Sequence, residues 1–369
     1  MRFYTKADLP SPCAVRDLWQ EIREDARPIV VYGTGNGADK LSAYLAEQGR
    51  EIADFFASDG FCRGQSFHGR RVLSFGEIRE KYDDFIILVA FGSTRREVLD
   101  TVYALDEEYP LRVPELPLAE KTLFDAAFYA AHYADIIAAY DLLADAISQS
   151  IFVSLILYRL SGRLSYLKNA VYTEDEGELL GLSSAKIAVD VGAYRGDTLT
   201  KWRAEAPSLS RVYAIEPDAK NFAKLLKVSQ DMPFEVRPIH AAAYDVDGEA
   251  TFMQSGNRNA TLQKTDETAS FQHKATPVQT VRIATVVGED TPDLIKFDTE
   301  GAEAAALRGS ASLISRAAPN LLVSAYHKSQ DVFSLLLLLA EEYPSLYRYY
   351  LRRIECIPGW EINLLAVKQ

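Results

Sequence analysis

The segment from Ile187 to Gly196 constrains the fold of this chain more than any other. It reads Ile-Ala-Val-Asp-Val-Gly-Ala-Tyr-Arg-Gly, and Asp197 and Thr198 follow it. An apolar strand here runs into a turn with glycines and then into a helix, which is typical of a βα unit. Glycines let the backbone approach a ligand closely, and a helix N-terminus favours an anionic group. The segment predicts a ligand at a strand's carboxyl end, and a plain βα turn is the alternative.

Seven strand-like segments lie between residue 186 and the C-terminus. Helical segments separate the early ones, whereas the last two follow each other closely. This order predicts a seven-stranded doubly wound sheet with an antiparallel hairpin at its edge. The expected strands are Ile187–Val191, Val212–Glu216, Phe234–Ile239, Asp293–Asp298, Leu321–Tyr326, Leu346–Arg352 and Glu361–Val367.

The N-terminal part also alternates between strand-like and helix-like segments. Apolar runs at Pro28–Tyr32, Ile52–Phe56 and Phe85–Phe91 predict parallel strands of a second α/β unit. We therefore expect two Rossmann-like domains, residues 1–113 and 173–369, joined by a helical bridge over residues 114–172.

The expected bridge is almost free of glycine. Apolar residues at helical spacing predict one amphipathic helix from Ala126 to Leu143, and a second helix covers Ile151–Leu160 and ends at Ser161-Gly162. We expect this region to help cover the C-terminal domain. The predicted wet face of the first helix carries Asp135, Asp141 and Asp145.

Composition excludes several classes of protein. The net charge of −12 argues against a nucleic-acid backbone as the main partner. The three cysteines form no ligand spacing, so neither a zinc site nor a disulfide framework is expected. The N-terminus has no apolar stretch typical of a secretory signal, and the longest apolar runs are far shorter than the roughly 20 residues that span a bilayer. We expect a cytoplasmic protein without a membrane span.

An acidic residue ends the second strand of the C-terminal domain. Glu216 follows the apolar run Val212–Ile215, and Pro217 suits the start of the next helix. A carboxylate at this place can accept hydrogen bonds from both hydroxyls of a ribose. A surface glutamate is the alternative, but the preceding strand is typical of a buried one. The ligand predicted at the glycine turn is therefore a nucleoside.

Three carboxylates and a histidine lie at the ends of the fourth and fifth predicted strands. Asp298, Glu300 and Glu303 end the fourth strand, and their crowding favours a raised pKa and a proton acceptor. Glu303 could instead stabilise the start of a helix. His327 follows the fifth strand, where its ordinary pKa suits proton abstraction from a hydroxyl, although a structural role is the alternative. A metal site made of these carboxylates is conceivable, but no metal is predicted, because no histidine or third acid stands at a supporting spacing.

Four segments in this domain resemble the FkbM-type methyltransferases. They are DVGAYRGDT, YAIEPDAKNF, IKFDTEGAEAAALRG and LLVSAYHK, and the resemblance covers residues 186–369. It implies a class I fold that transfers a methyl group from S-adenosylmethionine, most often to a hydroxyl oxygen. We expect the acceptor to be a hydroxyl of a sugar, glycan or related small molecule. The segment from Tyr140 to Leu160 also resembles the helical lead-in often found in that family.

The resemblance also implies roles for individual residues. Asp190, Gly192 and Gly196 would line the methionine side, Thr198 would meet its carboxylate, and Glu216 would bind the ribose. Asp298 would lie near the sulfonium, and the segment Ala241–Asp245 would border the adenine. The full set expected to bind the cofactor is Asp190, Gly192, Ala193, Tyr194, Gly196, Thr198, Glu216, Pro217, Ala242 and Asp298.

Two departures from the family pattern affect the acceptor side. Val286–Glu289 replaces the usual leucine-aspartate pair, and the segment Ser255–Thr276 is expected to be a long polar loop that shapes the acceptor site. We expect in-line displacement of the methyl group, accelerated mainly by positioning and to a smaller extent by a base. His327 is the first choice for that base, and Glu300 or Asp298 is the alternative.

The N-terminal domain has a glycine turn of its own. Gly33, Gly35, Asn36 and Gly37 follow a strand and open a helix, as a dinucleotide-binding turn requires, and Asp59 is the candidate acid of a second nucleotide site. The run from Phe55 to Glu77 is similar to the nucleotide-sugar-binding domain that precedes some sugar acetyltransferases. A module used only for packing or dimerisation is the alternative, and a homo-oligomer stays open.

Two other functions compete with methyl transfer. A non-catalytic protein could sense nucleotides through its Rossmann modules, but it would not need His327. An oxidoreductase could use the N-terminal glycine turn, but no second domain suited to hydride transfer is evident.

Overall fold

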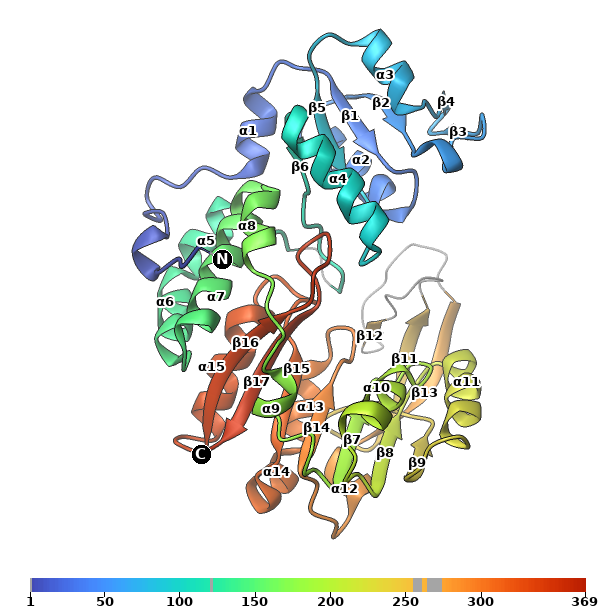
Figure 1. Ribbon diagram of the computed structural model, residues 1–369, viewed down its shortest axis with the longest axis vertical. Coiled ribbons are helices and arrows are strands. Elements are labelled where there is room, and N and C mark those ends of the chain that lie inside the picture. The colour runs from blue at the N-terminus through green and yellow to red at the C-terminus, as the bar shows by residue number, and fades with distance from the viewer. Residues whose placement is uncertain (1, 120–121, 255–260, 264–273) are drawn as a thin grey trace.

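The computed structural model describes residues 2–119, 122–254, 261–263 and 274–369. In Figure 1 an N-terminal α/β unit lies at the top, a group of helices lies below it, and a larger α/β unit lies at the bottom. The predicted α/β class with two Rossmann-like sheets is confirmed. Within the described ranges, each helix is too short or too polar to cross a lipid bilayer.

The N-terminal unit is built on a four-stranded parallel sheet with the order β2-β1-β5-β6. Its three longer strands are almost fully buried, as apolar runs in a parallel sheet require. All three strands predicted here are present. The elements are η1 (Lys6–Asp8), α1 (Leu18–Glu24), β1 (Ile29–Tyr32), α2 (Asn36–Glu47), β2 (Ile52–Phe56), η2 (Asp59–Phe61), β3 (Ser66–Phe67), β4 (Arg70–Arg71), α3 (Phe75–Lys81), β5 (Ile86–Val89), α4 (Arg96–Glu108) and β6 (Leu111–Arg112).

The C-terminal unit holds the predicted seven-stranded sheet, with the order β16-β17-β15-β14-β7-β8-β9. The strands from β15 to β9 pair in parallel, and β17 is antiparallel to both of its neighbours. The strand order reverses at β7, which is where doubly wound sheets bind their ligands. The strands are β7 (Ile187–Val191), β8 (Arg211–Ile215), β9 (Glu235–Ile239), β14 (Leu294–Phe297), β15 (Asn320–Ser324), β16 (Tyr347–Arg353) and β17 (Ile362–Lys368).

Helices cover both faces of this sheet because alternate strand residues point to opposite sides. Val189 and Val191 of β7 belong to one apolar cluster with helices α12 to α15. Ala188 belongs to another cluster with α10 and α11. The helices are α9 (Glu176–Leu179), α10 (Asp197–Glu205), α11 (Ala219–Ser229), α12 (Ile283–Val287), α13 (Glu303–Gly309), α14 (Ala311–Ala317) and α15 (Asp331–Glu342).

A smaller four-stranded sheet is formed by strands that follow β9 in the chain, in the order β10-β13-β11-β12. Its strands are β10 (Ala242–Ala243), β11 (Gly248–Gln254), β12 (Thr261–Gln263) and β13 (Lys274–Val281). The prediction of a continuous loop over Ser255–Thr276 is therefore wrong at β12 and at the start of β13, where backbone pairing with β11 forms a sheet. The rest of that segment lies outside the described residues.

Four helices lie between the two units. They are α5 (Ala126–Ala131), α6 (Tyr133–Leu142), α7 (Ala146–Ser161) and α8 (Leu164–Asn169). The prediction of one helix from Ala126 to Leu143 is wrong, because α5 ends and α6 begins at His132. Asp145 is also not on the wet face of that helix. Aspartate is a strong N-cap, and Asp145 caps α7 through Ser148 N and pairs with Arg352.

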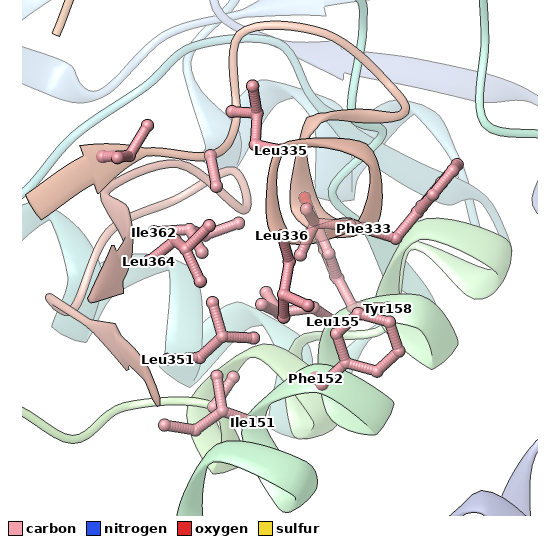
Figure 2. Close-up of a cluster of buried hydrophobic side chains, with 14 of the residues drawn as sticks. Ile151, Phe152, Leu155, Tyr158, Phe333, Leu335, Leu336, Leu351, Ile362 and Leu364 are labelled. Atoms are coloured by element: carbon pink, nitrogen blue, oxygen red, sulfur yellow. The ribbon is translucent and has the colours of Figure 1, made fainter. Parts of the chain in front are cut away.

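Helix α7 packs against the edge hairpin of the seven-stranded sheet. Figure 2 shows Ile151 and Leu155 of α7 in one apolar cluster with Leu351 of β16 and with residues of β17 and α15. The helix ends where Gly162 adopts a left-handed φ of 65°, as its sequence predicted. The helical region thus covers the C-terminal unit, as expected.

Candidate active site

The first glycine turn follows β7 and closes tightly on the neighbouring strand end. Gly192 has a φ of 81°, and a Cβ added there would lie 1.8 Å from the backbone oxygen of Asp298. Gly196, with a φ of 87°, is the N-cap of α10, and Thr198 is buried in the first turn of that helix. Only glycine fits at Gly192, because any side chain would collide with the end of β14.

Asp190 and Lys296 stand opposite each other on β7 and β14 and form a buried ion pair. Lys296 Nζ lies 3.3 Å from Asp190 Oδ1, whereas Asp190 Oδ2 is buried without a hydrogen-bond partner among the described residues. Burial raises the pKa of Asp190. Burial opposes the charge of Lys296 as well, but Asp190 and Asp298 outweigh it and raise the lysine pKa. Sequence reasoning missed Lys296, although a single lysine inside an apolar strand was a signal.

Glu216 lies directly after β8 with its carboxylate fixed by two backbone amides. Tyr194 N donates to Oε2 and Asp218 N donates to Oε1, each at 2.8 Å. Burial raises the pKa of Glu216 to about 7. Each carboxylate oxygen retains a lone pair, so the side chain can still accept hydrogen bonds from two hydroxyls.

The remaining residues of the predicted cofactor set line the same strand ends. Ala193 N donates to Ile215 O at 2.9 Å, which holds the turn against β8. Pro217 O accepts a hydrogen bond from His240 Nε2 at 3.1 Å. Ala242 is buried in β10, beyond the end of β9. The predicted set thus lies around the carboxyl ends of β7, β8 and β14 and at β10.

Asp298, Glu300 and His327 come together at the carboxyl ends of β14 and β15, as predicted. His327 is about 1% exposed, and its Nε2 lies 3.6 Å from Asp298 Oδ1 and 3.5 Å from Glu300 Oε2. These separations are too long for good hydrogen bonds, and Nε2 has no hydrogen-bond partner among the described residues. Burial raises the pKa of Glu300 to about 7.

Glu303 holds the other ring nitrogen of His327. Its Oε1 lies 2.9 Å from Nδ1 and also accepts hydrogen bonds from Thr299 N and Gly301 N. Burial opposes the charge of each side chain, but the attraction and hydrogen bond between them outweigh it. They lower the pKa of Glu303 and raise the pKa of His327. Glu303 lies in the first turn of α13, as the helix alternative expects. Its lowered pKa does not fit the proton acceptor expected from crowding, and its carboxylate orients His327 instead.

No histidine stands near these acids in sequence, but the fold joins His327 to them in a group that could hold a metal ion. A ligand atom from each of Asp298, Glu303 and His327 lies within 4.8 Å of the others. His327 is distant in sequence, and the parallel pairing of β14 with β15 brings it to the same edge.

The backbone of the loop that carries Glu300 is strained, and the segment that follows the N-terminal unit packs against this loop. Glu300 and Gly301 have φ values of 53° and 100°, and a left-handed backbone is unfavourable for a glutamate. Ala119 of the linker packs against Gly301, where a Cβ would lie 2.5 Å from the alanine Cβ. Ala119 N also donates to His327 O at 3.2 Å. The chain that leaves the N-terminal unit therefore supports the loop that carries Glu300.

The N-terminal glycine turn carries fewer polar groups. Gly33 has a φ of 116°, and a Cβ at Gly37 would lie 2.2 Å from Ala90 O. Gly35 and Asn36 are exposed at the start of α2, and Asp59 is exposed in η2. The other nearby acid, Asp54, is buried and bound by Lys81 and Tyr82.

Comparison with known proteins finds a family model that matches most of the seven-stranded sheet. Residues 190–349, fewer than half of the 369, match the model of the methyltransferase FkbM domain. A search of curated proteins found no match.

Solved structures extend the likeness to the whole fold. The crystal structure of a methyltransferase FkbM from Methylobacillus flagellatus KT matches with a TM-score of 0.70 at 20% identity, covering 94% of this chain and 92% of that chain. An rRNA methylase from Streptococcus thermophilus matches at 12% identity with a TM-score of 0.35, covering 52% and 93%. Fibrillarin from Aeropyrum pernix, in complex with S-adenosyl-L-methionine, matches at 14% identity with a TM-score of 0.30, covering 52% and 72%. The first of these likenesses shows a shared fold.

Proposed function

We propose, on the premise that residues 190–349 form a methyltransferase FkbM domain, that this chain transfers a methyl group from S-adenosylmethionine to a hydroxyl oxygen. The observation that carries the cofactor is the Glu216 carboxylate. It is buried directly after β8 and is held by two backbone amides, with a lone pair left on each oxygen. A ribose presents two adjacent hydroxyls, which such a carboxylate can accept together.

The methionine side of the cofactor fits the turn after β7. Asp190 Oδ2 is a buried acceptor without a partner among the described residues, and it can accept a hydrogen bond from an amino group. The absent Cβ at Gly192 leaves the backbone open to close approach. When bound, S-adenosylmethionine supplies an electrophilic methyl group on a positively charged sulfur. Asp298, about one third exposed beside this turn, can stabilise that charge.

The acid and histidine cluster supports a hydroxyl as the acceptor. An attacking hydroxyl has to lose a proton, and Asp298 and Glu300 offer carboxylate acceptors whose oxygens lie 3.6 and 3.5 Å from His327 Nε2. The neighbouring acids outweigh burial and raise the pKa of His327 to about 10, so the imidazole can act as the base only after it loses its own proton. Glu303 fixes the imidazole, so the ring need not reorient during the reaction. Most of the acceleration would come from positioning the two substrates. We propose a sugar or glycan-like molecule as the acceptor, in keeping with the resemblance of the N-terminal domain.

Equilibrium binding and methyl transfer test this function separately. S-adenosylmethionine and S-adenosylhomocysteine should each bind the full chain at one site in isothermal titration calorimetry. The double variant Asp190→Ala, Glu216→Ala should lose this binding, whereas Asp59→Ala should retain it. Failure of the wild-type protein to bind, or binding that survives the double substitution, would contradict the proposal.

Transfer of a labelled methyl group identifies the acceptor class. Incubation with labelled S-adenosylmethionine and a panel of sugars, nucleotide-linked sugars and glycans should yield base-stable ethers, because an O-methyl ether resists alkaline hydrolysis. Base-labile products would indicate carboxyl methylation and would contradict a hydroxyl acceptor. Cofactor binding without transfer to the panel would favour the non-catalytic nucleotide-sensing alternative.

A further inference from the structure

Two carboxylate oxygens face His327 Nε2 at separations that suit ligands of one metal ion. Nε2 lies 3.6 Å from Asp298 Oδ1 and 3.5 Å from Glu300 Oε2. Hydrogen bonds between such atoms are normally about 2.7–3.2 Å long. Two ligand atoms that each lie about 2.1 Å from one ion are separated by roughly 3.0–3.4 Å in octahedral or tetrahedral geometry. The observed separations are therefore closer to those of ligands that share an ion.

The imidazole is oriented as that of a metal ligand. A histidine ligand commonly donates its second ring N–H to a carboxylate, which fixes the tautomer and directs the free nitrogen at the metal. Glu303 Oε1 receives Nδ1 at 2.9 Å and accepts two backbone amides as well. Nε2 is then left buried, without a hydrogen-bond partner among the described residues, and faces two carboxylates.

The charges nearby leave Asp298 and Glu300 available. Lys296 lies 3.6 Å from Asp298 Oδ2, on the side away from His327, and is closer to Asp190. Oδ1 of Asp298 therefore faces the gap. Both carboxylates are about one third exposed, whereas His327 and Glu303 are buried, so an ion could enter from solvent onto a fixed imidazole.

We propose that this chain binds one divalent cation through His327 Nε2, Asp298 and Glu300, with Glu303 as the carboxylate that orients the histidine. Two carboxylates and one imidazole suit ions such as Mn²⁺, Fe²⁺ or Zn²⁺. The ion would hold the acceptor oxygen and lower the pKa of its hydroxyl. This role rests on the proposed methyl transfer, whereas the binding of the ion does not.

Mn²⁺ binding to the full chain tests the site directly. After treatment with EDTA and its removal, the protein should bind one Mn²⁺ per chain in a titration followed by electron paramagnetic resonance. Asp298→Asn and Glu300→Gln should each weaken the affinity by about tenfold or more. Asp331→Asn is the matched control, because that carboxylate lies nearby but accepts its hydrogen bond from Lys328 N. Its affinity should stay within about threefold of the wild-type value.

A nitrogen signature separates this site from weak binding to an acidic surface, which the net charge of −12 makes a real alternative. Pulsed electron paramagnetic resonance of bound Mn²⁺ should show coupling to one imidazole nitrogen, and this coupling should be absent in His327→Gln. Near-ultraviolet circular dichroism checks that the His327→Gln variant is folded. If that variant does not fold, Asp298→Asn and Glu300→Gln still test the site. Mn²⁺ bound without nitrogen coupling, no bound Mn²⁺, or unchanged affinity in both carboxylate variants would overturn the proposal. Loss of S-adenosylmethionine binding alone would overturn only the methyl-transfer function.

Discussion

The two Rossmann-like sheets repeat one backbone arrangement and equip it with different side chains. Gly33 follows β1 and donates its N–H to Phe56 O, while Gly192 follows β7 and donates to Ile215 O, each at 2.9 Å. Both glycines have positive φ, at 116° and 81°. In each sheet the next strand in register ends beside the turn. The backbone alone would predict two equivalent ligand sites.

The residues that follow the neighbouring strands separate the two sites. Directly after the second strand stands Ala57 in the N-terminal unit and Glu216 in the C-terminal one. Directly after the strand on the other side stand Ala90 and Asp298, whose amides make equivalent bonds to Tyr32 O and Val191 O. Glycine turns of this kind report how strands and helices pack, and the carboxylates beside them decide whether a nucleoside can be bound.

The largest expected effect concerns the packing role that the two turns share. Gly192→Ala places a Cβ 1.8 Å from Asp298 O and should destabilise the C-terminal unit by about 3 kcal/mol or more, with loss of cofactor binding. Gly37→Ala should destabilise the N-terminal unit for the same reason, at 2.2 Å from Ala90 O. Calorimetric unfolding of the full chain measures both.

Gly35→Ala is the control for these variants, because nothing lies within 4 Å of a Cβ built there. Its unfolding temperature should match that of the wild-type protein. If Gly192→Ala also leaves that temperature unchanged, the close approach of the two strand ends is not real.

The next effect concerns the carboxylate that only one turn possesses. Glu216→Gln should raise the dissociation constant of S-adenosylmethionine by about 10- to 100-fold, because hydrogen bonds to a charged group contribute about 1.5–3 kcal/mol. Asp54→Asn is the matched control in the other sheet, where the carboxylate is bound by Lys81 and Tyr82. Equal losses in the two variants would show that the effect arises from general instability.

The sequence predicted most of this comparison but not all of it. Apolar runs give the strands, and the positions of Glu216, Asp298 and His327 after such runs suffice to place them at one edge of a sheet. The break at His132 and the cap at Asp145 were missed, because a regular apolar spacing carries no signal for where one helix stops. Lys296 and the contact of Glu303 with His327 were missed because side chains meet across strands only once the register is known.

The pH dependence of cofactor binding gives a moderate effect. Burial raises the pKa of Glu216 from an ordinary value of 4.5 to about 7, so the free folded protein holds a proton there below neutrality. Ribose hydroxyls donate to the ionised form, so binding releases that proton. Affinity should rise with pH by at most tenfold per unit up to about pH 7 and then level off, as titration calorimetry in buffers of different pH can measure.

Stability should change in the opposite sense over the same range. A raised carboxyl pKa stabilises the fold fully below about pH 4.5, and this contribution is lost as the pH rises to about 7. Glu216→Gln should abolish the pH dependence of binding but only reduce that of stability, because burial also raises the pKa of Glu300 to about 7. If the affinity of the wild-type protein for the cofactor does not change with pH, and Glu216→Gln has the same affinity, then Glu216 does not bind the ribose.

The smallest effect is expected at the exposed end of the N-terminal turn. Asp59 is exposed in η2, two residues beyond Ala57, and so lies outside the position that Glu216 occupies after β8. Asp59→Ala should change the unfolding temperature by no more than about 2 °C, since surface substitutions rarely alter stability by more than about 0.5 kcal/mol. A nucleotide-linked sugar such as a uridine diphosphate sugar should then raise the unfolding temperature equally little in the wild-type protein and in the variant. A clear shift that Asp59→Ala removes would restore the second nucleotide site expected from the sequence. It would also show that Asp59, further along the loop, can do what Glu216 does after β8, although Ala57 stands at the equivalent position after β2.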